Sequence, residues 1–174
     1  MLPSGVAIVP LTLHHDDRGV FTELYRASWE TGIAPMQWNG VRSEPNVLRG
    51  VHVHRRHVDY LTLVAGRATI GLHDLRPGSP SDGLGTCIEL DAAAPSALVI
   101  PVGVAHGFYF HEPSIHVYAV SHEFDPADEL GCRWDDPALA IEWPCVSPHI
   151  SSRDRDLGSL SELRRTWNEE PVPA

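Results

Sequence analysis

The chain has 174 residues, of which 43% are hydrophobic and 21% charged, a composition typical of one soluble globular domain. Its formal net charge of −10 argues against a nucleic-acid-binding surface. No apolar run is long enough for a membrane span, and the first residues lack a basic-then-apolar secretory signal. The cysteines Cys87, Cys132 and Cys145 are widely spaced and odd in number, which favours free thiols in a reducing cytoplasm.

Short alternating or apolar segments separated by turn residues run through most of the chain, which predicts an all-β sandwich or barrel. Pro3 and Pro10 mark the first strand as an edge strand. The segment His14–Gly19 is predicted to be a turn, and Leu157–Asn168 a short C-terminal helix. In chain order the predicted strands are Met1–Leu13, Val20–Arg26, Met36–Ser43, Leu48–His54, Tyr60–Ala65, Arg67–Leu75, Thr86–Asp91, Ala97–Pro101, His106–His111 and Ile115–Phe124.

The strand Leu48–His54 carries two histidines on one face. His52 and His54 are two residues apart, so their side chains leave the same side of a strand. Two buried imidazoles need hydrogen-bond partners or a chemical role. This strand is therefore the first place to look for a site.

Several segments form a recognisable ordered set along the chain: HHDDRGVFTELYR, QWN at 37–39, NVLRGVH at 46–52, HDLRPGSPS at 73–81, IPVGVAHGF at 100–108, WDDPALAIEWP, and ISSRD at 150–154. In this order they resemble the dTDP-4-dehydrorhamnose 3,5-epimerase family, over roughly residues 6–160. The resemblance implies a cupin-type jelly-roll β-barrel, here one domain over residues 1–174, usually a homodimer. It implies an isomerase, an epimerase that inverts C3, C5 or both in a dTDP-4-keto-6-deoxyhexose during deoxysugar biosynthesis, without metal or other cofactor.

The resemblance also assigns catalytic roles. Inverting a carbon beside a ketone needs a base on one face and an acid on the other. The family's base corresponds to His52, its orienting carboxylate to Asp154 and its acid to Tyr118. Substrate contacts would fall on Arg18, Phe21, Glu23, Gln37, Asn39, Arg49 and His106.

One position departs from the family pattern and leaves alternatives open. The family usually has a lysine seven residues before the glycine that corresponds to Gly66, and this chain has Asp59 there. Either Arg49, His54 or His106 takes over the role of the lysine, or only one carbon is inverted. A non-catalytic homologue that binds a sugar nucleotide is another interpretation.

A metal-dependent enzyme is the main alternative class. The spacing of His52, His54, Asp59 and His106 is close to the two metal-binding motifs of cupins, and three imidazoles with one carboxylate suit a transition metal. That interpretation predicts an oxygenase or isomerase. In the structural interpretation, His54 and the nearby His57 are solvated or packing residues, Tyr118 is a barrel aromatic, and Asp154 caps a loop.

Overall fold

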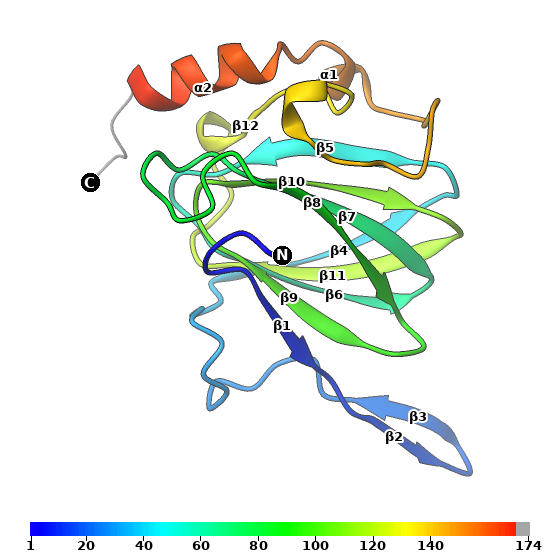
Figure 1. Ribbon diagram of the computed structural model, residues 1–174. Helices are drawn as coiled ribbons and strands as arrows, with labels where there is room; N and C mark the ends of the chain where they lie inside the picture. Colours follow the sequence, from blue (N-terminus) through cyan, green and yellow to red (C-terminus); the bar gives the residue numbers. More distant parts are fainter. Residues whose placement is uncertain (170–174) are drawn as a thin grey trace.

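Two five-stranded antiparallel sheets face each other in the computed structural model, which describes residues 1–169 (Figure 1). The architecture confirms the expected all-β, cupin-type jelly roll with short helices near the C-terminus. The first sheet has the order β1 (Ala7–Pro10), β9 (Ser96–Ile100), β6 (Asp59–Ala65), β11 (Ser114–Val120) and β4 (Gln37–Ser43). The second has the order β12 (Leu130–Gly131), β5 (Leu48–Val53), β10 (Val104–Phe110), β7 (Arg67–Asp74) and β8 (Gly85–Asp91).

The main core lies between the two sheets. It forms because alternate residues of each strand point inward, and the inward positions carry large apolar side chains. In β4 the alternation is visible along the strand, where half-buried residues alternate with exposed ones. The buried members of this core are Leu61, Leu63, Ala68, Ile70, Leu72, Leu90, Leu98, Ile100, Val104 and Phe110.

A separate hairpin projects from the body of the molecule (Figure 1). It consists of β2 (Leu13–Asp16) and β3 (Gly19–Thr22). The predicted turn His14–Gly19 is therefore wrong at both ends, because only Asp17 and Arg18 connect the two strands. Phe21 on this hairpin is 63% exposed, an unusual exposure for a large aromatic side chain.

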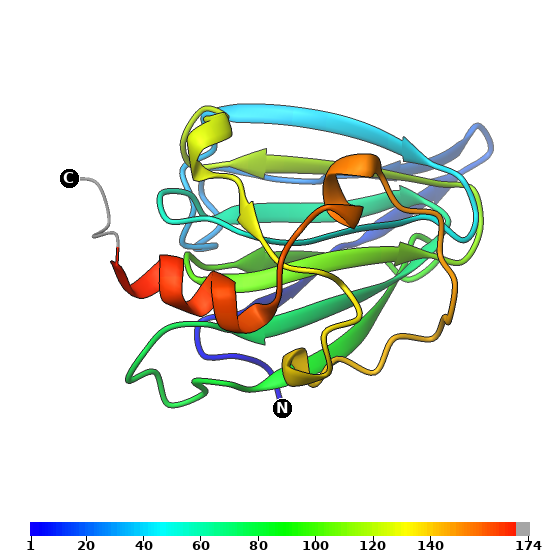
Figure 2. The same ribbon diagram turned by 90° about the horizontal axis from the view of Figure 1, so that it is seen from above.

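The outer face of the second sheet is covered by the C-terminal part of the chain (Figure 2). α2 (Leu160–Glu169) packs Leu160 and Leu163 against Val51 and Val53 of β5. The side chain of Glu162 accepts a hydrogen bond from Ser159 N at 2.7 Å, as the third residue of a capped helix does. The preceding short helix, α1 (Ser152–Arg155), lay outside the predicted elements.

The loop between β5 and β6 is fastened to α2. Arg55 donates to Thr166 O at 2.7 Å, and its guanidinium lies 4.7 Å from the centre of the Trp167 ring. None of the helices within residues 1–169 is long and apolar enough to cross a membrane. The last five residues of the expected domain 1–174 lie outside the described part of the chain.

Candidate active site

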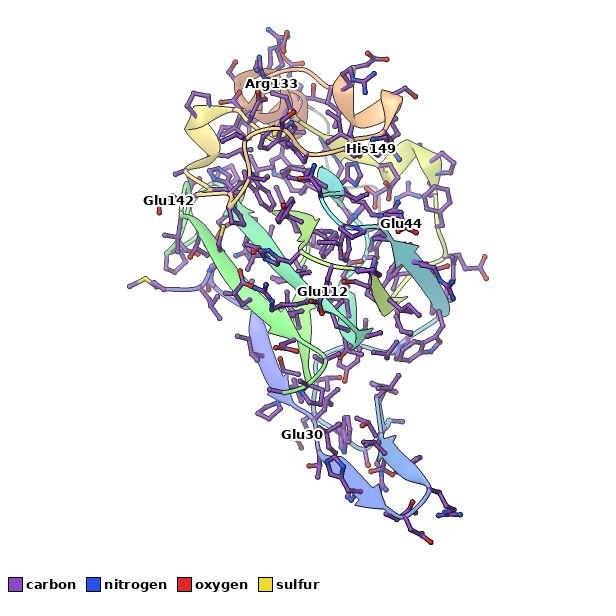
Figure 3. All side chains as sticks on the ribbon, turned by 90° about the vertical axis from the view of Figure 1, so that its right-hand side faces the viewer. Glu30, Glu44, Glu112, Arg133, Glu142 and His149 are labelled. Atoms are coloured by element: carbon purple, nitrogen blue, oxygen red, sulfur yellow. The ribbon has the colours of Figure 1, made fainter. Side chains whose placement is uncertain are left out.

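A cavity of about 820 Å³ opens between the two sheets and is lined by strands of both. Glu44 and His149, which lie near each other in Figure 3, belong to its lining. His52 of β5 and Tyr118 of β11 also line it, from opposite sheets. The strands therefore bring together, in one hollow, residues that are far apart in the sequence.

His52 and Asp154 form a hydrogen-bonded pair in this cavity. His52 Nε2 lies 2.7 Å from Asp154 Oδ1, and the His52 side chain is 19% exposed while that of Asp154 is 6% exposed. Gly50 N also donates to Asp154 Oδ2, at 3.4 Å. Burial alone would raise the pKa of Asp154, but the His52 ring and the Gly50 N–H hold it below its ordinary value. The carboxylate is thus kept ionised beside the imidazole.

Helix α1 fixes the position of Asp154. The side chain of Ser151 accepts a hydrogen bond from Asp154 N at 3.0 Å, which caps the first turn of this four-residue helix. The carboxylate is therefore placed by a structured turn, and it does more than cap a loop.

Tyr118 carries a phenol that is neutral at physiological pH. Burial raises the pKa of Tyr118, and the carboxyl groups of Asp59 and Glu129 raise it further, against the opposing charge of Arg49. A neutral phenol can donate a proton or a hydrogen bond to a group in the cavity.

A second group of ionisable side chains lines the same cavity. His54, His57 and Asp59 are all buried, and one potential ligand atom of each lies within 4.8 Å of those of the others. Burial raises the pKa of Asp59 well above its ordinary value, helped by the nearby Glu129. Burial and neighbouring imidazoles hold the pKa of His54 far below its ordinary value. Of the two structural alternatives for His54 and His57, burial excludes a solvated residue and agrees with a packing residue.

The structure places the expected substrate-binding residues in three different positions. Asn39, Arg49 and His106 line the cavity. Gln37 lies beside it without lining it, where it donates to Asn39 Oδ1 at 2.9 Å and accepts from Phe124 N. The other three expected contacts, Arg18, Phe21 and Glu23, lie on or just after the projecting hairpin and do not line this chain's cavity.

The four residues of the metal-dependent alternative do not form one group. His54 and Asp59 are together, and His106 Nε2 lies 3.9 Å from Asp59 Oδ2. His52 is instead paired with Asp154. His57 occupies the place in the group that the sequence pattern assigned to His52.

His116 is a cavity residue that the sequence analysis missed. It lies on β11 with its ring stacked against those of Phe108 and Phe110, and its Nδ1 is buried without a hydrogen-bond partner among residues 1–169. Burial lowers the pKa of His116 to about 4, and Arg49 contributes. Its position two residues before Tyr118 on the same strand face is the signal that could have revealed it.

Comparison with known proteins identifies the family. The model of the dTDP-4-dehydrorhamnose 3,5-epimerase family matches residues 3–162. The chain belongs to this family. The expected assignment to an epimerase, and therefore to the isomerases, is confirmed.

Three relatives illustrate the similarity. The dTDP-4-dehydrorhamnose 3,5-epimerase of Escherichia coli K12 is 35% identical over 172 residues, which covers 92% of each chain. The dTDP-4-dehydrorhamnose 3-epimerase of Streptomyces niveus is 35% identical over 158 residues, covering 86% of this chain and 76% of its own. The solved 3,5-epimerase from Legionella pneumophila, in complex with dTDP-4-keto-L-rhamnose, superimposes with a TM-score of 0.84 at 30% identity and covers 91% of this chain and 92% of its own.

Proposed function

We propose that this protein epimerises a dTDP-4-keto-6-deoxyhexose at C3, C5 or both, in deoxysugar biosynthesis. The observation that carries the proposal is the pair formed by His52 and Asp154, which lies in a cavity that Tyr118 lines from the facing sheet. The similar relatives include a protein named as a 3,5-epimerase and one named as a 3-epimerase, so the proposal leaves open which of the two carbons is inverted.

In the proposed reaction, His52 removes the proton from the carbon next to the ketone. Its Nε2 faces Asp154, which leaves Nδ1 as the nitrogen that accepts the proton. The C–H bond breaks, its electron pair moves toward the keto oxygen, and an enolate forms. The carboxylate of Asp154 keeps the ring oriented and stabilises the imidazolium.

Tyr118 then completes the inversion. Its phenol gives a proton to the opposite face of the same carbon, and the enolate returns to the ketone. Solvent reprotonates the phenolate, and the imidazolium loses its proton. Because one proton leaves and one returns, the reaction consumes no oxidant or reductant.

Arg49 and Asn39 are our candidates for binding the nucleotide part of the substrate. The Arg49 guanidinium is held at the cavity by its hydrogen bond to Ser43 Oγ at 3.0 Å. A planar guanidinium matches the oxygens of a diphosphate. His106 lines the same cavity and is buried.

The projecting hairpin supports a homodimer in which each chain completes the other's site. A two-stranded hairpin with exposed apolar residues is marginally stable alone. Val20 and Phe21 are 56% and 63% exposed, which leaves apolar surface for a partner to cover. We propose that Arg18, Phe21 and Glu23 contact substrate in the cavity of the partner chain. The free thiols of all three cysteines fit a reducing cytoplasm.

A solvent-exchange experiment tests the reaction directly. The enzyme is incubated with dTDP-4-keto-6-deoxyglucose in D2O, and deuterium at C3 and C5 is followed by NMR. We expect exchange at one or both carbons, and His52→Asn abolishes it. Tyr118→Phe keeps some exchange but loses inversion, because only the second proton transfer is removed. Absence of exchange at both carbons in the wild-type protein contradicts the proposed function.

A further inference from the structure

Four ionisable side chains at the inner end of the cavity form a group that the proposed proton transfers do not use as acids or bases. We call His54, His57, Asp59 and His106 the His–Asp group. The first three come from the loop between β5 and β6 and the start of β6, and His106 from β10. All four residues are 4–6% exposed.

In two of these histidines, Nδ1 lies near oxygen atoms of Asp128 or Glu129. His54 Nδ1 lies 3.3 Å from Glu129 Oε1 and 3.4 Å from the backbone oxygen of Asp128. His57 Nδ1 lies 3.7 Å from Asp128 Oδ2. In metal sites the nitrogen that does not bind the ion faces a carboxylate or a carbonyl in this way, which orients the ring and leaves Nε2 for the ion.

The third histidine has the same arrangement. His106 Nδ1 is hydrogen-bonded at 3.0 Å to the backbone oxygen of Val104, and its Nε2 lies 3.9 Å from Asp59 Oδ2. His57 Nε2 lies 3.7 Å from the same oxygen. These nitrogens thus converge on the carboxyl group of Asp59.

The Asp59 carboxyl group faces the cavity without a close donor among residues 1–169. Its contacts to the two Nε2 atoms are longer than hydrogen bonds, and within residues 1–169 no donor is hydrogen-bonded to it. A cation between the carboxyl group and the imidazoles would give this group the close partner that the described residues do not supply.

We propose that His54, His57 and Asp59, with His106 as a fourth ligand, form a binding site for a divalent transition-metal ion of the zinc type. Three imidazoles and one carboxylate are a ligand set that zinc accepts in tetrahedral geometry. Ligand atoms bound at about 2.0–2.1 Å in a tetrahedron are about 3.3 Å apart. The ligand atoms of the first three residues lie within 4.8 Å of one another, so each needs to move inward by under about 1 Å.

The ion would also balance the charge of the inner cavity. The carboxyl groups of Asp59, Asp128 and Glu129 lie around the imidazoles there. An enolate formed nearby would be repelled by carboxylates, and a bound divalent cation reverses that repulsion. This consequence for catalysis, unlike the site itself, rests on the proposed function.

Metal binding is tested without substrate. The protein is stripped with a chelator, titrated with Zn²⁺ in competition with a chromophoric chelator, and analysed for metal after dialysis. We expect one Zn²⁺ per chain, and binding weaker by at least about 100-fold in Asp59→Asn and His57→Gln. The matched control is His111→Gln, because His111 also lies 3.4 Å from a carboxylate, that of Glu89, but outside the cavity.

Two results would overturn the site. One is an affinity in Asp59→Asn and His57→Gln equal to that of His111→Gln, which indicates adventitious binding. The other is a Co²⁺ spectrum of the wild-type protein that matches the hydrated ion, without the intense bands of tetrahedral coordination. The Co²⁺ measurement needs no variant, so it decides even if a variant folds poorly.

The catalytic consequence has its own measurement. Deuterium exchange at C3 and C5 is compared between metal-free and Zn²⁺-loaded wild-type protein, and we expect faster exchange in the loaded form. Equal rates in the two forms would refute a role of the ion in catalysis. Absence of exchange in both forms would count against the proposed function, whereas the titration alone decides the site.

Discussion

At the scale of single residues, the pair of His52 and Asp154 is the feature on which the proposed chemistry depends. The two residues are 102 positions apart in the sequence, yet their side chains meet at 2.7 Å. The sequence alone suggested both, but only through resemblance to a family. Neither the alternation of a strand nor the local sequence SSRD indicates that they touch.

Replacing the carboxylate tests the pair. In Asp154→Asn the amide no longer stabilises the imidazolium and can favour the wrong tautomer of His52. We expect kcat for epimerisation to fall by roughly 10²- to 10⁴-fold with little change in KM. The control is Asp156→Asn, an exposed aspartate two residues further on, which should keep the wild-type rate. A rate in Asp154→Asn equal to that of the control would contradict the assigned role.

His116 makes the stability of the fold depend on pH. Its pKa is lowered to about 4 by burial, while an unfolded chain has a histidine pKa of about 6.5. As pH falls through this window the unfolded chain takes up the proton first, so stability is lost on acidification, by up to about 3 kcal/mol for this group. Replacement by His116→Phe should flatten the dependence between pH 6.5 and 4. Urea unfolding at several pH values in this range measures how the unfolding free energy changes with pH. The control is His122→Gln, at an exposed position. If the unfolding free energy of His116→Phe depends on pH as that of the wild type does, the prediction is refuted.

At the scale of elements, the period-two patterns predicted most strands because one face of each is buried. The errors lie where burial does not set the pattern. The hairpin β2–β3 is exposed on both faces, so the polar residues His14–Asp16 of β2 show no alternation and resemble a turn. Helix α1 has four residues, which is too short to show a helical period in the sequence. Its first turn is fixed by the hydrogen bond from Asp154 N to Ser151 Oγ. The roles of His57 and His116 depend on partners from distant strands, which no local pattern reveals.

The cap of α1 should matter for both stability and rate. Ser151→Ala removes the acceptor for Asp154 N, which costs about 1 kcal/mol of unfolding free energy. The first turn of the helix then loosens and the carboxylate loses its fixed position beside His52. We therefore expect a fall in kcat larger than the small loss of stability explains. Chemical unfolding and the exchange assay measure the two effects, with exposed Ser152→Ala as a control. Equal kcat values in the two variants would show that the cap does not position the carboxylate.

At the scale of the whole molecule, the hairpin makes the proposed active site a property of two chains. A chain with His52→Asn has an intact hairpin, and a chain with Arg18→Ala and Phe21→Ala has an intact catalytic pair. Each homodimer should be nearly inactive. In a mixed dimer one site receives both intact parts, so equal mixing should restore about one quarter of wild-type activity. Light scattering verifies the dimer, and a mixture no more active than its components would place the hairpin residues outside the partner's cavity.

The contacts of Arg55 with Thr166 and Trp167 connect the last turns of α2 to the active-site cavity. Arg55 stands directly after His54 in the loop that carries His54 and His57, two of the four residues of the His–Asp group, and it is anchored by Thr166 and Trp167 of α2. The last turns of α2 thus hold in place the loop that lines part of the cavity. A variant truncated before Thr166 should keep both sheets but lose the anchor of this loop. We therefore expect its kcat to fall much more than its melting temperature.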